Sequence, residues 1–181
     1  MTNIIQIKHV NETFDRILDS SNSLIQKSFD CSIPFGIETY KNKQIVNLEL
    51  TDDKYIILEL EKQLRDAYFN DDNDNISNNI CQWKSAFRGN MLRTKIFKSM
   101  IDIFSEENKR LSSYEFPKKK KCHVKIRLRG IYRSLWNENT NNRIIIETNT
   151  QNINNNNYDE NKVVIQPIWE ILKIQILSNN K

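Results

Sequence analysis

The segment from Cys122 to Trp136 constrains the fold more than any other part of the chain, because its side chains alternate in character. The apolar members are Val124, Ile126 and Leu128, and the cationic members between and after them are Lys125, Arg127 and Arg129. Successive side chains of a strand point to opposite faces, so the pattern predicts one face on a core and three cations on the other. The cations would lie about 6.5–7 Å apart, close to the phosphate repeat of an extended single strand. Gly130 then predicts a bulge or the close approach of another backbone.

This strand lies inside a strongly basic block. Residues 81–133 hold 15 cations and 4 acids, a net charge of +11, whereas the remaining residues hold 12 cations and 19 acids. A block with this net positive charge favours a polyanionic partner, because neutralising phosphates releases condensed counterions. For the run from Lys118 to Lys121 taken alone, a solvated lysine face explains the pattern equally well.

Aromatic residues are interleaved with these cations. Proteins that bind single strands combine a cationic groove with aromatic rings on which bases stack. The rings expected in the core are Phe97, Phe104 and Phe116. The candidates for base stacking are Trp83, Phe87, Tyr132 and Trp136, for which a place in the core is the open alternative.

The rest of the chain predicts strands around two helices. Apolar residues at helical spacing predict helices over residues 12–27 and 53–69, the second capped by Thr51 and Asp52. The expected strands are 4–10, 37–40, 45–50, 92–98, 122–136 and 143–148. Residues 163–166 look extended, and 168–177 fit a helix or a strand. Asn-rich stretches at about 70–80 and 149–161 predict mobile loops.

These elements favour one compact arrangement. The length of 181 residues suits a single domain over 1–181, and neither Asn-rich stretch resembles a domain linker. The expected class is α+β or mainly β. Its specific form is a five-stranded, antiparallel barrel of the oligonucleotide-binding (OB) type, with two flanking helices and long Asn-rich loops.

The sequence offers little for catalysis. Three glycines are too few for the GxxxxGK[ST] or GxGxxG phosphate cradles. Cys122 and His123 would face opposite ways on a strand, which argues against a Cys–His dyad or a joint metal site. The acids of residues 71–74 lie in a polar loop and are expected to be solvated. We therefore expect no catalytic residue, no metal site, no cofactor and no enzyme activity.

Compartment is indicated by two further features. The chain has no run of about 18 apolar residues, and polar residues interrupt its first ten, so neither a membrane span nor a signal peptide is expected. Cys31, Cys81 and Cys122 are far apart and odd in number. They predict buried, reduced thiols in an intracellular protein rather than a disulfide scaffold or a zinc site.

Two segments resemble the single-stranded-DNA-binding proteins of large nucleocytoplasmic DNA viruses. They are residues 33–50, IPFGIETYKNKQIVNLEL, and residues 124–133, VKIRLRGIYR, the latter similar to a late strand with an LxGIW pattern. The resemblance implies an OB fold and cooperative coating of replicating viral DNA in a cytoplasmic factory. The 26 Ile, 25 Asn and 18 Lys residues have AT-rich codons and also indicate an AT-rich genome.

We interpret the chain as a non-catalytic, sequence-nonspecific binder of single-stranded DNA that coats replication or repair intermediates. DNA and RNA are not distinguished by these residues, and self-association along the strand stays open. The alternatives are a nucleoprotein of a virion core that only neutralises DNA charge and, less favoured, a nuclease. The expected backbone contacts are Lys125, Arg127, Arg129 and Arg133, extended by Lys84, Arg88, Arg93, Lys95 and Lys98 and by a flexible clamp of Lys118, Lys119, Lys120 and Lys121.

Overall fold

The computed structural model describes residues 5–70, 81–97, 101–137, 142–144 and 161–178. Within them the chain is mostly β, with one α-helix, α1 (Lys54–Asn70), and one short 3-10 helix, η1 (Ser113–Glu115). The strands are β1 (Gln6–Asn11), β2 (Phe14–Leu18), β3 (Gln26–Ile33), β4 (Ile37–Tyr40), β5 (Lys43–Glu49), β6 (Cys81–Trp83), β7 (Phe87–Arg88), β8 (Met91–Ile96), β9 (Asp102–Phe104), β10 (Arg110–Leu111), β11 (Lys120–Asn137), β12 (Asn142–Ile144) and β13 (Asn161–Ile176).

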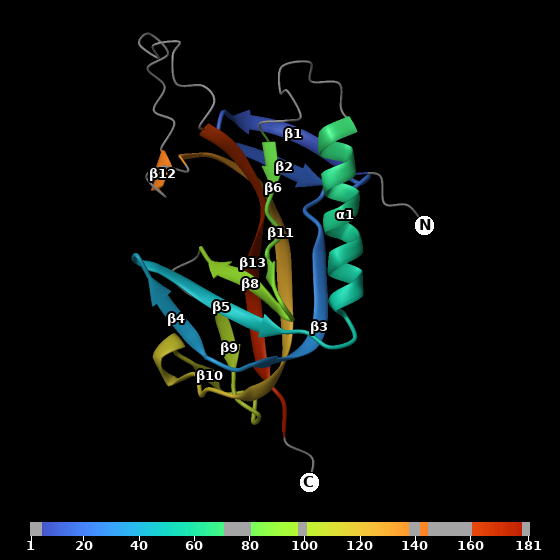
Figure 1. The fold of residues 1–181 in the computed structure, drawn as a ribbon. Coiled ribbons are helices and arrows are strands. Elements are labelled where there is room, and N and C mark those ends of the chain that lie inside the picture. The colour runs from blue at the N-terminus through green and yellow to red at the C-terminus, as the bar shows by residue number, and fades with distance from the viewer. Residues whose placement is uncertain (1–4, 71–80, 98–100, 138–141, 145–160, 179–181) are drawn as a thin grey trace.

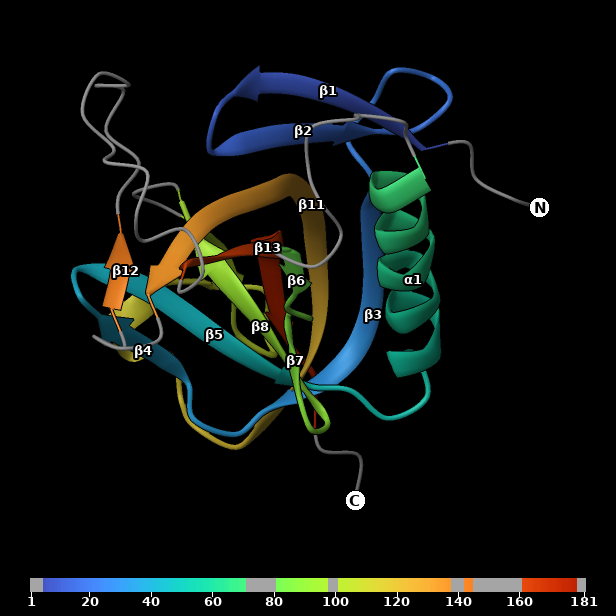
Figure 2. The same ribbon diagram turned by 45° about the horizontal axis from the view of Figure 1, so that its top comes forward.

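Five of these strands close into a ring. Hydrogen-bonded pairs run from β3 to β5, β8, β13 and β11, and β11 pairs back with β3 (Figure 2). The pair β8–β13 is parallel and the other four are antiparallel, so the expectation of a wholly antiparallel arrangement is wrong. β4 continues the path of β3 after a bend at 34–36 and pairs with the first half of β5.

The alternation predicted for the basic strand is confirmed in β11. Val124, Ile126 and Leu128 are fully buried, and they face the core enclosed by the ring. Lys125 and Arg129, on the opposite face, are exposed. Burying these branched side chains stabilises the fold by about 1.5–3 kcal/mol each. The strand therefore has one structural face and one cationic face.

Gly130 lies where another backbone crosses β11. β2 pairs with β11 through Asp15 and Phe14, and the register between β11 and β13 shifts next to Gly130. A Cβ atom at this position would lie 2.1 Å from the carbonyl oxygen of Asp15. The close approach predicted from the sequence is therefore present, and only glycine fits there.

The helix expected over residues 12–27 is wrong. Its first part is β2, the second strand of a hairpin with β1, and its last residues begin β3. Between them the carboxylate of Asp19 accepts hydrogen bonds from the backbone N–H groups of Ser21 and Ser23 and from the Ser21 hydroxyl. Such local bonds compete with helical ones and favour a turn. They also lower the pKa of Asp19.

The helix expected over residues 53–69 is confirmed as α1, which lies beside β3 in both views (Figures 1 and 2). Ile57, Leu60 and Leu64 recur at three- and four-residue spacing and are buried in the core cluster. Glu61 is also buried, and it accepts bonds from the Ser85 hydroxyl (2.5 Å), the Ala86 N–H (3.2 Å) and the Trp169 indole N–H (3.4 Å). These bonds attach α1 to the ring.

Other expectations meet the structure in part. The strand pair at 37–50 and the strand near 92–98 are present as β4, β5 and β8, and the ambiguous segment 168–177 belongs to β13. β12 covers the start of the strand expected at 143–148, whose end lies outside the described residues. The Asn-rich stretches also lie almost wholly outside them. Within the described residues, no helix is both long and apolar enough to cross a membrane.

Candidate nucleic-acid interface

The outward side chains of β5, β8, β13 and β11 lie on one side of the sheet, which we call the outer face; in its middle row Ile45 and Glu170 are buried. Register places Ile45, Lys95, Glu170 and Arg127 side by side in one row across these four strands. Thr94, the neighbour of Lys95, is fully buried and points inward, so Lys95 and its row point outward. The outward cations of these strands are Lys43, Arg93, Lys95, Lys121, Lys125, Arg127, Arg129 and Lys173.

Arg127 and Glu170 form an ion pair in the middle of this row. The Nη2 and Nε atoms of Arg127 lie 2.6 Å and 3.1 Å from Oε2 of Glu170. The Glu170 side chain is only 2 % exposed and that of Arg127 is 25 % exposed. Arg127 is therefore partly engaged within the fold. Removing it would leave a buried carboxylate without its partner.

Lys125 and Lys173 face each other one step further along the same two strands. Both are exposed, and Lys125 forms no ion pair with any described residue. The neighbour of Lys173 on its other side is Asp102, whose carboxylate pairs with Arg110 at 3.0 Å. The Lys173 ammonium instead lies 4.9 Å from the ring centre of Phe104. Two like charges directly opposite each other destabilise a sheet, so this pair favours an anion between them.

Arg129 projects from the irregularity beside Gly130 and covers an exposed aromatic ring. Its guanidinium carbon lies 4.0 Å from the ring centre of Phe97, and Phe97 is 44 % exposed. The expectation that Phe97 lies in the core is therefore wrong, whereas Phe116 is buried as expected and Phe104 is half-buried. Strand alternation from Leu92 would have placed Phe97 on the outward side with the cations.

The tip of the β4–β5 hairpin adds a cationic and aromatic element that the sequence did not single out. Tyr40 pairs with Lys43 around a two-residue turn in which Lys41 and Asn42 both have positive φ, 47° and 60°. Tyr40 is 57 % exposed, and the Lys41 ammonium lies 5.5 Å from its ring centre. The hairpin tip continues the outer face because Gln44, next to Lys43, pairs with Ile96 at the end of β8.

Arg133 lies away from the outer face, in an ion cluster beneath the β1–β2 hairpin. Its Nη2 atom is 3.1 Å from Oδ1 of Asp15, 2.9 Å from the carbonyl oxygen of Asn11 and 3.0 Å from Nδ1 of His9. Asp15 is buried and also accepts a bond from the Tyr68 hydroxyl at 3.3 Å. Burial raises the pKa of Tyr68 to about 12. This cluster ties the hairpin, β11 and α1 together.

The three aromatic candidates whose side chains the structure describes are half-buried. Trp83 and Phe87 are half-buried and pack against the core cluster, and Tyr132 is half-buried in β11 beside Phe14 of β2. The side chain of Trp136 lies outside what the structure describes, as does Lys98. Lys84 and Arg88 are exposed, but Arg88 adjoins the β7–β8 turn, at the opposite end of β8 from Phe97.

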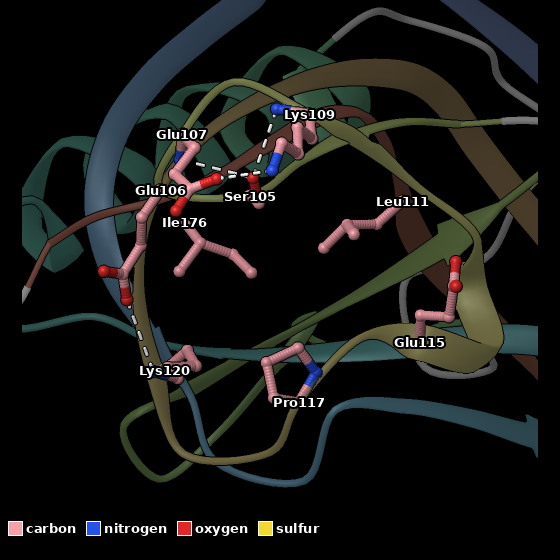
Figure 3. Close-up of a pocket in the computed structure, with 9 residues that line it drawn as sticks. All are labelled: Ser105, Glu106, Glu107, Lys109, Leu111, Glu115, Pro117, Lys120 and Ile176. Atoms are coloured by element: carbon pink, nitrogen blue, oxygen red, sulfur yellow. Dashed lines mark hydrogen bonds and ion pairs between the residues drawn. The ribbon is translucent and has the colours of Figure 1, made fainter.

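The lysine run from 118 to 121 divides between two surfaces. Lys118 and Lys119 lie in the turn before β11 and are exposed, and Lys121 points outward from β11. Lys120 instead pairs with Glu106 at 3.3 Å beside a pocket of about 410 Å³ (Figure 3).

That pocket is unsuited to a phosphate. Its charged lining is Glu106, Glu107, Glu115, Lys109 and Lys120, and both lysines are paired, Lys109 with Glu107 at 2.7 Å (Figure 3). The Ser112 hydroxyl and N–H donate to Glu115 and lower its pKa, which keeps a third carboxylate charged. Three carboxylates against two paired ammonium groups repel a polyanion.

The cysteines are buried to different degrees and unpaired. Cys31 and Cys122 are buried cross-strand neighbours, Cys81 is half-buried, and all three thiols are free. Burial raises the pKa of each thiol, that of Cys122 to about 12. Among the residues that the structure describes, no three His, Cys, Asp or Glu side chains gather as a metal-binding group.

Comparisons with known proteins add little to this geometry. No protein-family model matches the chain, and no curated protein sequence matches it. Among solved structures, a C-terminally truncated single-stranded DNA-binding protein from bacteriophage Enc34 is similar, with a TM-score of 0.41 and 10% identity. The match covers 98% of this chain and 97% of that chain. A likeness of this size carries no argument about what the chain binds.

Proposed function

We propose that this chain binds single-stranded nucleic acid, DNA in preference, without sequence specificity, and coats intermediates of replication or repair. The observation that carries the proposal is the outer face, where cations from β5, β8, β13 and β11 share one side of the sheet with the exposed ring of Phe97. A cationic surface with accessible aromatic rings is what single-strand binding requires, because it neutralises phosphates and also offers bases a stacking surface.

The order of strands in the ring supports an OB-type barrel. Numbered along the chain, β3, β5, β8, β11 and β13 are strands one to five, and their order around the ring is 1-2-3-5-4. The OB fold is a five-stranded Greek-key barrel that binds oligonucleotides on its second and third strands and on the loops between strands one and two and between four and five. By this numbering, β5 and β8 and the β4–β5 hairpin tip belong to the proposed site.

The proposed contacts differ from those expected from sequence. Arg93, Lys95, Lys121, Lys125 and Arg129 keep the role of phosphate ligands, and Lys43, Lys173 and Phe97 join them. Arg127 contributes through a guanidinium that Glu170 already holds in place. Arg133 is assigned to the fold, because its ion cluster with Asp15 occupies it. Lys118 and Lys119 act as an electrostatic clamp beside the start of β11.

Binding to labelled oligo-dT, measured by fluorescence anisotropy, tests this proposal against duplex DNA and RNA of the same length. We expect the tightest binding to oligo-dT, with log K falling by about 0.7 per neutralised phosphate as log[salt] rises. Lys62→Ala, an exposed cation on α1, is the matched control and should bind as the wild type does. Equal affinity for duplex and single strand would favour charge neutralisation alone, and no binding at low salt would overturn the proposal.

A further inference from the structure

Phe97 is an exposed ring whose face is already occupied by a neighbour. The guanidinium carbon of Arg129 lies 4.0 Å from its ring centre, yet 44 % of Phe97 remains accessible. The two residues come from different parts of the ring, since Phe97 follows β8 and Arg129 belongs to β11, with β13 between these strands. The contact therefore joins two elements that are not neighbours in the strand order.

Arg129 differs from the other arginines of its strand in its partners. Arg127 is paired with Glu170 and Arg133 with Asp15, but among the described residues no carboxylate pairs with Arg129. Instead of an ion pair, its guanidinium makes a cation–π contact with the Phe97 ring. A cation–π contact at an exposed site is weak, and stacking of a base on an aromatic ring is stronger. The contact is therefore one that a nucleobase can replace.

We infer that Phe97 is a platform for a nucleobase and that Arg129 is its exchangeable cap. This inference rests on the proposed function and assigns a step to it. In the free chain the guanidinium covers the ring. When single-stranded nucleic acid binds, a base stacks on Phe97, and Arg129 moves to the adjacent phosphate, where charge-assisted bonds replace the contact it lost. Lys95 and Lys43 lie beside this position along β8 and β5.

The exchange predicts effects of opposite sign for two ligands that share the same phosphates. Oligo-dT carries bases and phosphates, whereas an abasic oligonucleotide of equal length carries phosphates alone. Phe97→Leu removes the platform, so oligo-dT affinity should fall about 5- to 100-fold. The same change releases Arg129 from its cap before binding, so abasic affinity should rise about two- to fivefold.

A second background isolates the cap. In an Arg129→Ala chain no guanidinium covers the ring, so adding Phe97→Leu should still weaken oligo-dT binding and should leave abasic binding unchanged. Tyr55→Leu, an aromatic 76 % exposed on α1, is the matched control and should alter neither affinity. Thermal melting of each variant shows that the affinities refer to folded chains, as the exposure of Phe97 predicts.

The outcomes separate the inference from the function on which it rests. Opposite changes for the two ligands support the platform and the cap together. If Phe97→Leu leaves oligo-dT affinity unchanged or lowers both affinities equally, the platform is wrong. If it weakens oligo-dT but leaves abasic affinity unchanged, the exchange is wrong. Failure of the wild-type chain to bind either ligand at low salt would instead overturn the proposed function.

Discussion

Lys125 of β11 lies directly opposite Lys173 of β13, with both side chains exposed on the outer face. Like charges in this position cost about 0.2–1 kcal/mol of stability relative to a neutral pair. A chain selected for stability alone would have no reason to place them there. The pair is explained if an anion lies between the two ammonium groups when the protein is at work.

Lys125→Gln should therefore stabilise the free protein and weaken its binding at the same time. At low salt the free energy of unfolding should rise by about 0.2–1 kcal/mol, and the gain should shrink as salt screens the repulsion. Affinity for oligo-dT should fall, with a shallower salt dependence, because a phosphate contact is lost. Chemical denaturation and anisotropy on one preparation measure both; a variant that is less stable and binds normally would count against the pairing argument.

Asp15→Asn should destabilise the protein without weakening its binding. It removes the charged partner of Arg133 from the cluster beneath the β1–β2 hairpin, which should cost about 1.5–3 kcal/mol of unfolding free energy. The cluster lies away from the outer face, so oligo-dT affinity of the folded protein should be unchanged. A loss of affinity without a loss of stability would show that this cluster, with Arg133, takes part in binding.

Ile126→Ala tests the buried side of the basic strand. Ile126 is fully buried, and its truncation should cost about 2–5 kcal/mol through lost burial and a residual cavity. Binding by the fraction that remains folded should persist, because its neighbours Lys125 and Arg127 still point outward. Thermal melts combined with oligo-dT titration decide between this result and a strand whose two faces are not distinct.

Glu61 gives stability a specific pH dependence. Burial raises its pKa above the ordinary value of 4.5, although the bonds from Ser85, Ala86 and Trp169 oppose the shift. A carboxyl group with a raised pKa stabilises the fold when protonated, so its contribution is present below pH 4.5 and is lost as pH rises through the raised value. As pH rises from 4.5 through the raised pKa, the free energy of unfolding of the wild type should fall relative to that of Glu61→Gln. A wild type that becomes more stable than Glu61→Gln as pH rises would contradict the raised pKa.

Local patterns in the sequence were sufficient where one face of an element is buried and the other is solvated. The period of two in β11 and the period of 3.6 in α1 each identified the element and its inward residues. The helical period gave a wrong prediction at residues 12–27. Phe14, Ile17 and Leu18 suit a helix or a strand, and the turn made by Asp19 decides between them.

Partners across strands could not be predicted, because they depend on register. Nothing in the local sequence indicates that Arg127 meets Glu170 or that Arg133 meets Asp15, residues more than forty positions apart in each case. Nor does it indicate that Phe97, which follows β8, meets Arg129 of β11. The cationic face was predictable from the sequence, whereas the subset of its cations free to meet a ligand was not.

In the function we propose, the outer face carries the binding of single strands. The most direct test of this proposal is the salt dependence of oligo-dT affinity for the wild type and for a Lys125→Ala, Arg129→Ala, Lys173→Ala triple variant, with Lys62→Ala as control. The triple variant should fold normally, bind far more weakly, and have a slope lower by about 0.7 for each phosphate contact removed. A folded triple variant with the affinity and slope of the wild type would contradict the proposal.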